Sequence, residues 1–229
     1  GRTWRSISEG LTCREIRTLC QNADGELFAG SKGYGIFQWR KDEWQTMQPF
    51  GQWGVIWPIW DDRPLYQYTS LLIHPENSRR VMIGTFPQGI YISEDAGAHW
   101  RESNIGWSTD GVFRLVSHPE EPAIVYAGTY NGINRSSDFG RHWEVADNGW
   151  PDEQWVFSID FDPRDPSIMY ACSKNGENEG RGREGFHGTV MKSTDGGDHW
   201  FEITNGLDTG QEFYEILVDR HDSSILYLA

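Results

Sequence analysis

The chain has 229 residues, of which 34 are acidic and 20 are lysine or arginine, and its formal net charge is −14. Basic groups that displace counterions supply most of the affinity for polyanions, so the composition excludes nucleic acids and anionic membrane surfaces as expected partners. Hydrophobic residues make up 37% of the sequence. No apolar run approaches the roughly 20 residues of a membrane span, so we also expect no membrane insertion.

The sequence contains 12 tryptophans and 26 glycines and shows little helical periodicity. This combination predicts many short strands joined by tight turns. The cysteines, Cys13, Cys20 and Cys172, are too few and too scattered for a disulfide framework or a metal site, and we expect buried thiols. We therefore predict no metal site and no cofactor. The alternative is a calcium site, if the acidic loops cluster oxygen ligands, although the sequence has no EF-hand-like spacing. The compartment stays open, with an extracellular or periplasmic location of a secreted protein preferred.

A unit of four strands repeats along the chain. In the clearest copy the first strand is 112–117, a His-Pro turn follows, and the second and third strands are 124–128 and 132–135. A short fourth strand follows a tryptophan. Four antiparallel strands per repeat is the pattern of a blade, so the predicted fold class is an all-β propeller in a single domain or fragment, 1–229. In chain order the predicted blades are 1–11 (partial), 12–50, 64–105, 110–148, 154–206 and 211–229 (partial).

Three of these blades carry the motif S-x-D-x-G-x-H-W between their third and fourth strands, at 93–100, 136–143 and 193–200. In such a turn the Asp accepts backbone hydrogen bonds, the Gly supplies backbone freedom and the Trp packs under the turn. A degenerate copy ends at Trp44, and Trp4 matches the last residue of another. The predicted structural residues are Asp95, Gly97, Trp100, Asp138, Gly140, Trp143, Asp195, Gly197 and Trp200.

The motifs resemble the Asp-box, or BNR, repeats of a propeller family that includes sialidases, xyloglucanase-type glycoside hydrolases, the sortilin ectodomain and photosystem II assembly factors. The resemblance implies that the box is a folding element away from the active face. It does not specify a function, because one fold hosts many sites. Residues 213–219 and 225–229 match the first two strands of a further blade. Either the N-terminal strand completes that blade, or the chain is an excerpt of a propeller of about seven blades, which we prefer.

Connections in an antiparallel blade alternate between its two ends, so the boxes lie at one end and the second-to-third loops and blade crossings lie at the other. Two long insertions, 50–64 and 175–187, both fall at the end opposite the boxes. Long loops on a rigid scaffold are where binding usually resides. Six tryptophans in the crossings are the predicted ligand-binding aromatics: Trp53, Trp57, Trp60, Trp107, Trp150 and Trp155.

Carboxylates lie near these tryptophans in the sequence. The candidates for catalysis are Asp61, Asp62, Asp110, Glu153 and Glu212. Glycoside hydrolysis needs two carboxyl groups about 5 Å apart for retention or roughly 6.5 to 9.5 Å apart for inversion, and the sequence cannot pair them. For any one of these carboxylates a solvated loop position is the alternative.

The first strands place polar residues at one position. Aligning them on their turns brings Arg17, Ser70, Arg114, Ser158 and Glu215 together, with Thr18, Leu71, Leu115, Ile159 and Ile216 as their neighbours. Two interpretations are open: an ion-pair network in which Glu215 and Asp160 balance the arginines, or a carboxylate-binding site. Phe113-Arg114-Leu115 resembles the start of the sialidase motif F-R-I-P, but Val116 replaces its proline. Arg17, Arg114 and Glu215 are therefore further predicted ligand-binding residues.

Aromatic faces beside carboxylates suit a sugar, whose C–H faces stack while its hydroxyls bind planar acceptors. The leading hypothesis is recognition of a glycan or polysaccharide on the tryptophan-rich face, with glycoside hydrolysis as an added activity. The alternative is a non-catalytic scaffold for a protein partner, because tryptophan and tyrosine also anchor protein interfaces.

Overall fold

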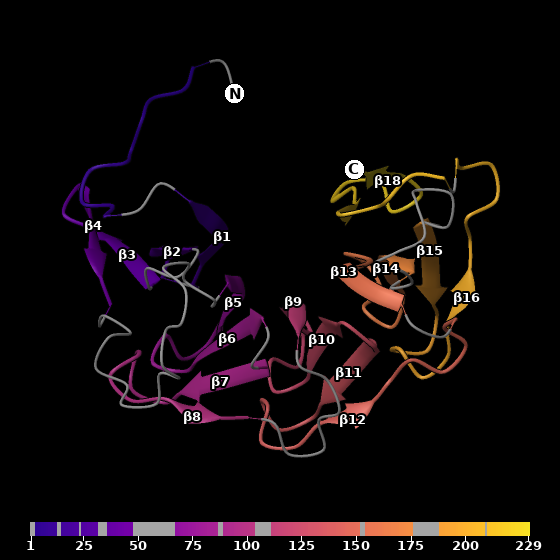
Figure 1. The fold of residues 1–229 in the computed structure, drawn as a ribbon, viewed down its shortest axis with the longest axis horizontal. Coiled ribbons are helices and arrows are strands. Elements are labelled where there is room, and N and C mark those ends of the chain that lie inside the picture. Colours follow the sequence, from indigo (N-terminus) through magenta and orange to yellow (C-terminus); the bar gives the residue numbers. More distant parts are fainter. Residues whose placement is uncertain are drawn as a thin grey trace, which may run out of the picture. The chain divides into compact units, whose positions relative to one another are not determined.

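The computed structural model describes residues 3–12, 15–22, 24–31, 36–47, 67–86, 89–103, 111–151, 154–175, 188–208 and 210–229. The regular elements in these ranges are all strands (Figure 1). A helix that could cross a membrane does not occur within these ranges. The chain divides into two compact units, Gly1–Glu102 and Ser103–Ala229, which are described separately.

The first unit contains two four-stranded antiparallel sheets, each with its strands in chain order. The first sheet comprises β1 (Ile16–Gln21), β2 (Leu27–Ser31), β3 (Ile36–Arg40) and β4 (Glu43–Thr46). The second comprises β5 (Gln67–Ile73), β6 (Val81–Phe86), β7 (Gly89–Ser93) and β8 (Arg101–Glu102). They correspond to the predicted blades 12–50 and 64–105.

The second unit contains two more sheets of the same kind and one strand pair. The first sheet is β9 (Val112–Ser117), β10 (Val125–Thr129), β11 (Gly132–Ser136) and β12 (Glu144–Val145). The second is β13 (Gln154–Phe161), β14 (Met169–Asn175), β15 (Gly188–Ser193) and β16 (Phe201–Glu202), and the pair is β17 (Ile216–Val218) with β18 (Leu226–Leu228). The predicted four-stranded antiparallel blades are confirmed.

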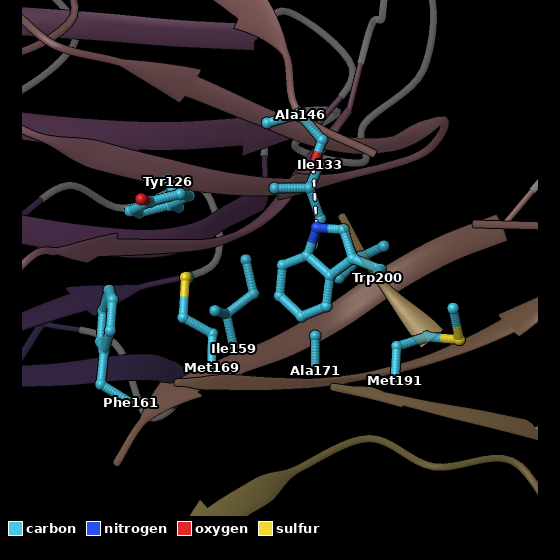
Figure 2. Close-up of a cluster of buried hydrophobic side chains, with 10 residues drawn as sticks. Tyr126, Ile133, Ala146, Ile159, Phe161, Met169, Ala171, Met191 and Trp200 are labelled. Carbon is cyan, nitrogen blue, oxygen red and sulfur yellow. Dashed lines mark hydrogen bonds between the residues drawn. The ribbon is translucent and has the colours of Figure 1, made fainter. Parts of the chain in front are cut away.

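Within each unit, a blade packs its first strand against the preceding blade. In the first unit, Leu71 and Ile83 share a buried cluster with Phe28 and Ile36. In the second unit, the corresponding cluster joins β10 and β11 to β13, β14 and β15 (Figure 2). Its Trp200 indole Nε1 donates a hydrogen bond to the carbonyl of Ala146, at 3.0 Å, and so ties the end of one blade to the crossing from the blade before it.

The segment before β1 matches a blade crossing. The Trp44 amide donates to the carbonyl of Glu9 and its indole donates to the carbonyl of Ile7. Trp200 makes the same two bonds to Asn148 and Ala146. This correspondence places Trp4 at the position of Trp143, as the sequence comparison predicts.

Each four-stranded sheet has one β-bulge in its first strand, at an equivalent position. The register skips one residue in each of these strands, which is Arg17, Thr69, Phe113 or Phe157. Tyr214 takes this position before β17, because its amide and that of Glu215 both donate to the carbonyl of Ala229. A bulge redirects the side chain of the extra residue, so this residue does not follow the alternation of its strand.

The register corrects the predicted alignment of Arg17. Thr18 pairs with Gly30 as Arg114 pairs with Gly128, so Thr18 is the equivalent of Arg114 and Arg17 is the bulged residue. The alignment was wrong by one residue because the turn after β1 is shorter: the Asn22 amide donates to Glu26, whereas the His118 amide donates to Ile124.

Candidate functional site

Five aromatic side chains gather at one end of the blades in the second unit, where the first strands begin and the second strands end. The bulged residues form a row, with ring centroids 4.7 Å apart for Phe113 and Phe157 and 5.0 Å apart for Phe157 and Tyr214. Tyr130 and Trp155 add to the row, with centroids 4.1 Å apart. We call these five residues the aromatic cluster.

The rings of the cluster are only partly covered. Phe113, Tyr130, Trp155 and Phe157 are half-buried, and Tyr214 is 51% exposed. Phe113 stacks near Tyr130 at 5.8 Å and near Trp155 at 6.1 Å, with interplanar angles of 26° and 25°. The result is a connected aromatic surface that reaches solvent.

A lysine and a glutamate hold the cluster together. The Lys174 Nζ lies 4.8 Å from the centroid of Trp155, 5.6 Å from that of Phe157 and 5.9 Å from that of Tyr214. It also lies 3.1 Å from the Glu212 Oε1, and the two side chains are only 13% and 28% exposed. A partly desolvated cation over aromatic faces is stabilised by the ring quadrupoles.

Glu212 also binds the tyrosine of the row. The Tyr214 hydroxyl donates to the Glu212 Oε2. This bond to a carboxylate, together with burial, raises the pKa of Tyr214 above its usual value of 10.0. Glu212 therefore fixes both the cation and the outermost ring, and it is the one predicted catalytic carboxylate that lies within the described ranges.

Beside the cluster, the polar position of the first strands carries Arg114, Ser158 and Glu215. Arg114 lies 3.8 Å from Glu215, and the Ser158 hydroxyl donates to Glu215 at 3.3 Å. The Arg114 Nε is buried and has no hydrogen-bond partner among the residues that the structure describes. Asp160 does not join this group, because it accepts from the Val218 amide and pairs with Arg220 at 2.9 Å.

The other predicted site residues are distributed as follows. Trp155 is part of the aromatic cluster, whereas Trp150 packs edge-on against Trp200 with centroids 5.7 Å apart. Arg17 lies exposed in the first unit. Eight predicted residues lie outside the described ranges: Trp53, Trp57, Trp60, Asp61, Asp62, Trp107, Asp110 and Glu153.

Sequence reasoning missed Phe113, Tyr130, Phe157, Lys174 and Tyr214 as members of one surface. A signal was present, because Phe113, Phe157 and Tyr214 lie at the same distance before the residue that opens the first turn of their blades. The alternation of a strand does not reveal a bulge, so this signal could be interpreted only with the register known.

The thiols and acidic groups offer little for cofactor or metal chemistry. Burial raises the pKa of Cys20 and of Cys172 to about 12, which leaves both thiols protonated and unreactive. Cys13 lies outside the described ranges. Across the part of the chain that the structure describes, no three His, Cys, Asp or Glu side chains gather closely enough to hold a metal ion.

The S-x-D-x-G-x-H-W turns lie at the opposite end of the blades and share one geometry. In the turn at 193–200, one Asp195 oxygen accepts from the His199 amide at 2.9 Å and the other from the His199 Nδ1 at 2.8 Å. The Ser193 hydroxyl accepts from the Gly197 amide at 2.9 Å, and the φ of Gly197 is +85°. The turns at 93–100 and 136–143 repeat these bonds.

These bonds shift the titration of the turn aspartates. The His99 and His199 amides, followed by their imidazoles, lower the pKa of Asp95 and Asp195 to about 2. At Asp138 burial acts in the opposite direction, but the bonds from His142 outweigh it and the pKa is again about 2. The acceptors are thus used within the turn, which is what a structural role requires.

No protein-family model matches the chain, and no curated protein matches it. Among solved structures, it is similar to an ancestral GH74 enzyme, with a TM-score of 0.69 and 15% identity over 94% of this chain and 29% of that one. It is also similar to the extracellular domain of a one-component system from B. thetaiotaomicron, with a TM-score of 0.53 and 12% identity over 99% of this chain and 34% of that one. The chain therefore spans about a third of the length of these two proteins. Together with the sheet topology, the similarity confirms the predicted β-propeller fold class.

Proposed function

We propose that the chain recognises a glycan or polysaccharide through the aromatic cluster of its second unit. The observation that carries this proposal is the connected, partly exposed surface of five rings built around the Lys174–Glu212 pair. Flat rings accept the C–H faces of a sugar, and a few fixed polar groups beside an apolar surface orient a ligand. Lys174 supplies donors and Glu212 supplies acceptors for hydroxyl groups.

We also propose that the chain belongs to the Asp-box propellers and acts outside the cytosol. Three S-x-D-x-G-x-H-W turns with one hydrogen-bond pattern support membership of the Asp-box propellers, in which these turns are structural. The likeness in fold to an ancestral GH74 enzyme and to an extracellular domain supports a carbohydrate-related role outside the cytosol.

Binding and hydrolysis are separate parts of the proposal. The contacts of Glu212 with Lys174 and Tyr214 support a role in ligand binding rather than in proton transfer. Hydrolysis would require a pair of carboxyl groups flanking the sugar bond. If product is released, we propose that two of the four carboxylates Asp61, Asp62, Asp110 and Glu153 form this pair.

The test is a screen of the purified chain on a glycan and polysaccharide array that includes xyloglucan and sialylated oligosaccharides, with tryptophan fluorescence and product release recorded. We expect Trp155→Ala and Tyr214→Ala to weaken binding at least about tenfold. Tyr227→Ala is the matched control, because Tyr227 is also about half exposed, at 55%, and also donates to a carboxylate, that of Asp219.

Two results would contradict the proposal: no glycan binds, or binding survives in both Trp155→Ala and Tyr214→Ala. If no glycan binds, the same cluster becomes a candidate anchor for a protein partner, because aromatic residues beside charged pairs are typical of interface hot spots. The same variants then test that scaffold role in a pull-down with proteins.

A further inference from the structure

The turn between the first and second strands of every blade is closed by one side chain that accepts backbone hydrogen bonds. In the turn after β1 the Asn22 Oδ1 accepts from the Glu26 amide at 2.9 Å. In the last two, the Asp162 Oδ1 accepts from Arg164 at 2.8 Å and the Asp219 Oδ1 accepts from His221 at 2.8 Å. An Asn or Asp oxygen is the usual acceptor in such a turn.

The two remaining blades use a histidine at this position. The His74 Nδ1 accepts from the Glu76 amide at 3.2 Å. The His118 Nδ1 accepts from the amides of Glu120 and Glu121, at 3.3 and 3.1 Å. An imidazole nitrogen accepts a hydrogen bond only when it carries no proton, so both rings must be neutral with their proton on Nε2.

The motif histidines require the opposite arrangement. The Nδ1 of His99, His142 and His199 lies 2.7 to 2.8 Å from an Asp carboxylate, which can only accept. Each of these rings must therefore carry its proton on Nδ1. A second proton, on Nε2, leaves this donor in place, whereas a proton on the Nδ1 of His74 or His118 removes the acceptor that closes the turn.

The surroundings of His74 favour its neutral form. The side chain is buried, and the charged groups that act on it among the described residues are Arg80, Glu76 and Glu94. Burial first, and then the positive charge of Arg80, lower the pKa of His74 below its usual 6.5, against the opposing charges of Glu76 and Glu94. His74 therefore contributes stability that is fully present above about pH 6.5 and is lost as the pH falls from there through the lower pKa of the folded state.

The surroundings of His118 come from its own turn and from the next blade. The charged side chains of the turn are those of Glu120 and Glu121. From β13 the ring of Phe161 lies edge-on to the imidazole, with centroids 5.6 Å apart.

Both turns also support the neighbouring S-x-D-x-G-x-H-W turn. The Ala96 amide donates to the carbonyl of Arg79 at 2.7 Å, and the Phe139 amide donates to that of Ala123 at 2.7 Å. Loss of the cap therefore loosens two connected turns at one end of a blade. In the second unit, the aromatic cluster lies at the end of the blades opposite the His118 turn and uses none of these groups.

We propose that His74 and His118 are acid-sensitive turn caps. Their protonation selectively loosens the blades β5–β8 and β9–β12, while the Asn- and Asp-capped blades keep their turns. The chain thus contains a conformational response to mild acid in two defined blades. The response is independent of the proposed glycan site.

The first test reads the tautomers in the unaltered protein by 15N–1H NMR of the imidazoles at about pH 7.5. We expect the proton on Nε2 in His74 and His118 and on Nδ1 in His99, His142 and His199. His74→Asn and His118→Asn assign the two signals by removing them one at a time. A proton on Nδ1 in His74 and His118 overturns the proposal.

The second test compares urea midpoints at about pH 7.5 and about pH 5.5, where histidines titrate. The double variant His74→Asp, His118→Asp places an aspartate in both turns, as in the turns after β13 and β17, where Asp162 and Asp219 are the caps. We expect it to reduce the acid-induced fall in midpoint by about half or more. If aspartate disturbs folding, the double variant His74→Asn, His118→Asn replaces it, because asparagine caps the turn after β1.

The control is His142→Gln, which removes an imidazole that donates rather than accepts. It should not reduce the fall in midpoint, because the His142 Nδ1 donates to Asp138 whether or not the ring carries a second proton. The proposal is overturned if neither double variant reduces the fall, or if His142→Gln reduces it as much as they do.

Discussion

The two ends of the blades in the second unit differ in what their side chains contact. At the end with the S-x-D-x-G-x-H-W turns, the Asp138 carboxylate and the Ser136 hydroxyl bind backbone amides of their own turn. At the other end, Lys174, Glu212 and Tyr214 bind one another and the surrounding rings. Backbone bonds fix a turn, whereas side chains that meet one another form a surface that varies from blade to blade.

The tryptophans show the same difference. Trp200 is 4% exposed and donates to a backbone carbonyl of the preceding blade, so it belongs to the core. Trp155 is half-buried and contacts Tyr130 and Lys174 within the aromatic cluster. The two ends therefore separate stability from recognition, and substitutions should affect one or the other.

The largest expected effect is that of Trp200→Ala on stability. A large aromatic truncated in a packed core costs about 3–5 kcal/mol. Trp155→Ala should cost about 1–2 kcal/mol, because its ring is only partly covered. Urea unfolding followed by circular dichroism measures both. Equal losses in the two variants would contradict the separation, and Trp200→Phe should recover part of the loss.

The next effect is that of Asp138→Asn, which weakens the bonds accepted from His142 and should cost about 1 kcal/mol of unfolding free energy at neutral pH. Because the pKa of Asp138 is about 2 in the fold and 3.8 ordinarily, its contribution is present above about pH 3.8. It is lost as the pH falls from there toward 2. Stability measured across this range should fall less in the variant than in the parent, and an unchanged slope would contradict the assignment.

At the other end, Lys174→Met should weaken glycan binding about tenfold, and its loss of stability should stay below that of Trp200→Ala. The substitution keeps a long apolar side chain against Trp155 but leaves Glu212 without its cation. Lys192→Met is the matched control, because the Lys192 Nζ lies 5.3 Å over the ring of Tyr170, outside the aromatic cluster. Titration by tryptophan fluorescence compares the two, and equal effects would place binding elsewhere.

How much of this difference is predictable from sequence depends on the kind of contact. The motif turns are predictable because each contains its own donors and acceptors: the spacing of Ser193, Asp195 and His199 already contains the hydrogen bonds that the structure has. The blades follow for the same reason, since their pairing is between neighbours in the chain.

The aromatic cluster was only partly predictable, because its members meet through long-range packing. Trp155 was identified because the sequence placed it in a crossing, although it lies in β13 and pairs with Lys174. Phe113 and Phe157 look like ordinary strand residues until the bulge that redirects them is known. A bulge also shifts the alternation of a strand by one residue. The short turn after β1 caused a related error, because the sequence alignment put Arg17 at the position that Thr18 occupies.

The smallest expected effect concerns the contact between neighbouring blades at the motif end. The Tyr126 hydroxyl donates to the carbonyl of Gly196 at 2.7 Å, so it ties β10 to the motif turn that follows β15. Tyr126→Phe keeps the ring and removes this bond, which should cost about 1 kcal/mol. Because the bond lies at the end opposite the aromatic cluster, glycan affinity should stay unchanged, as measured on the same samples. If the variant loses affinity but not stability, the two ends are coupled, and the separation argued from Trp200 and Trp155 fails.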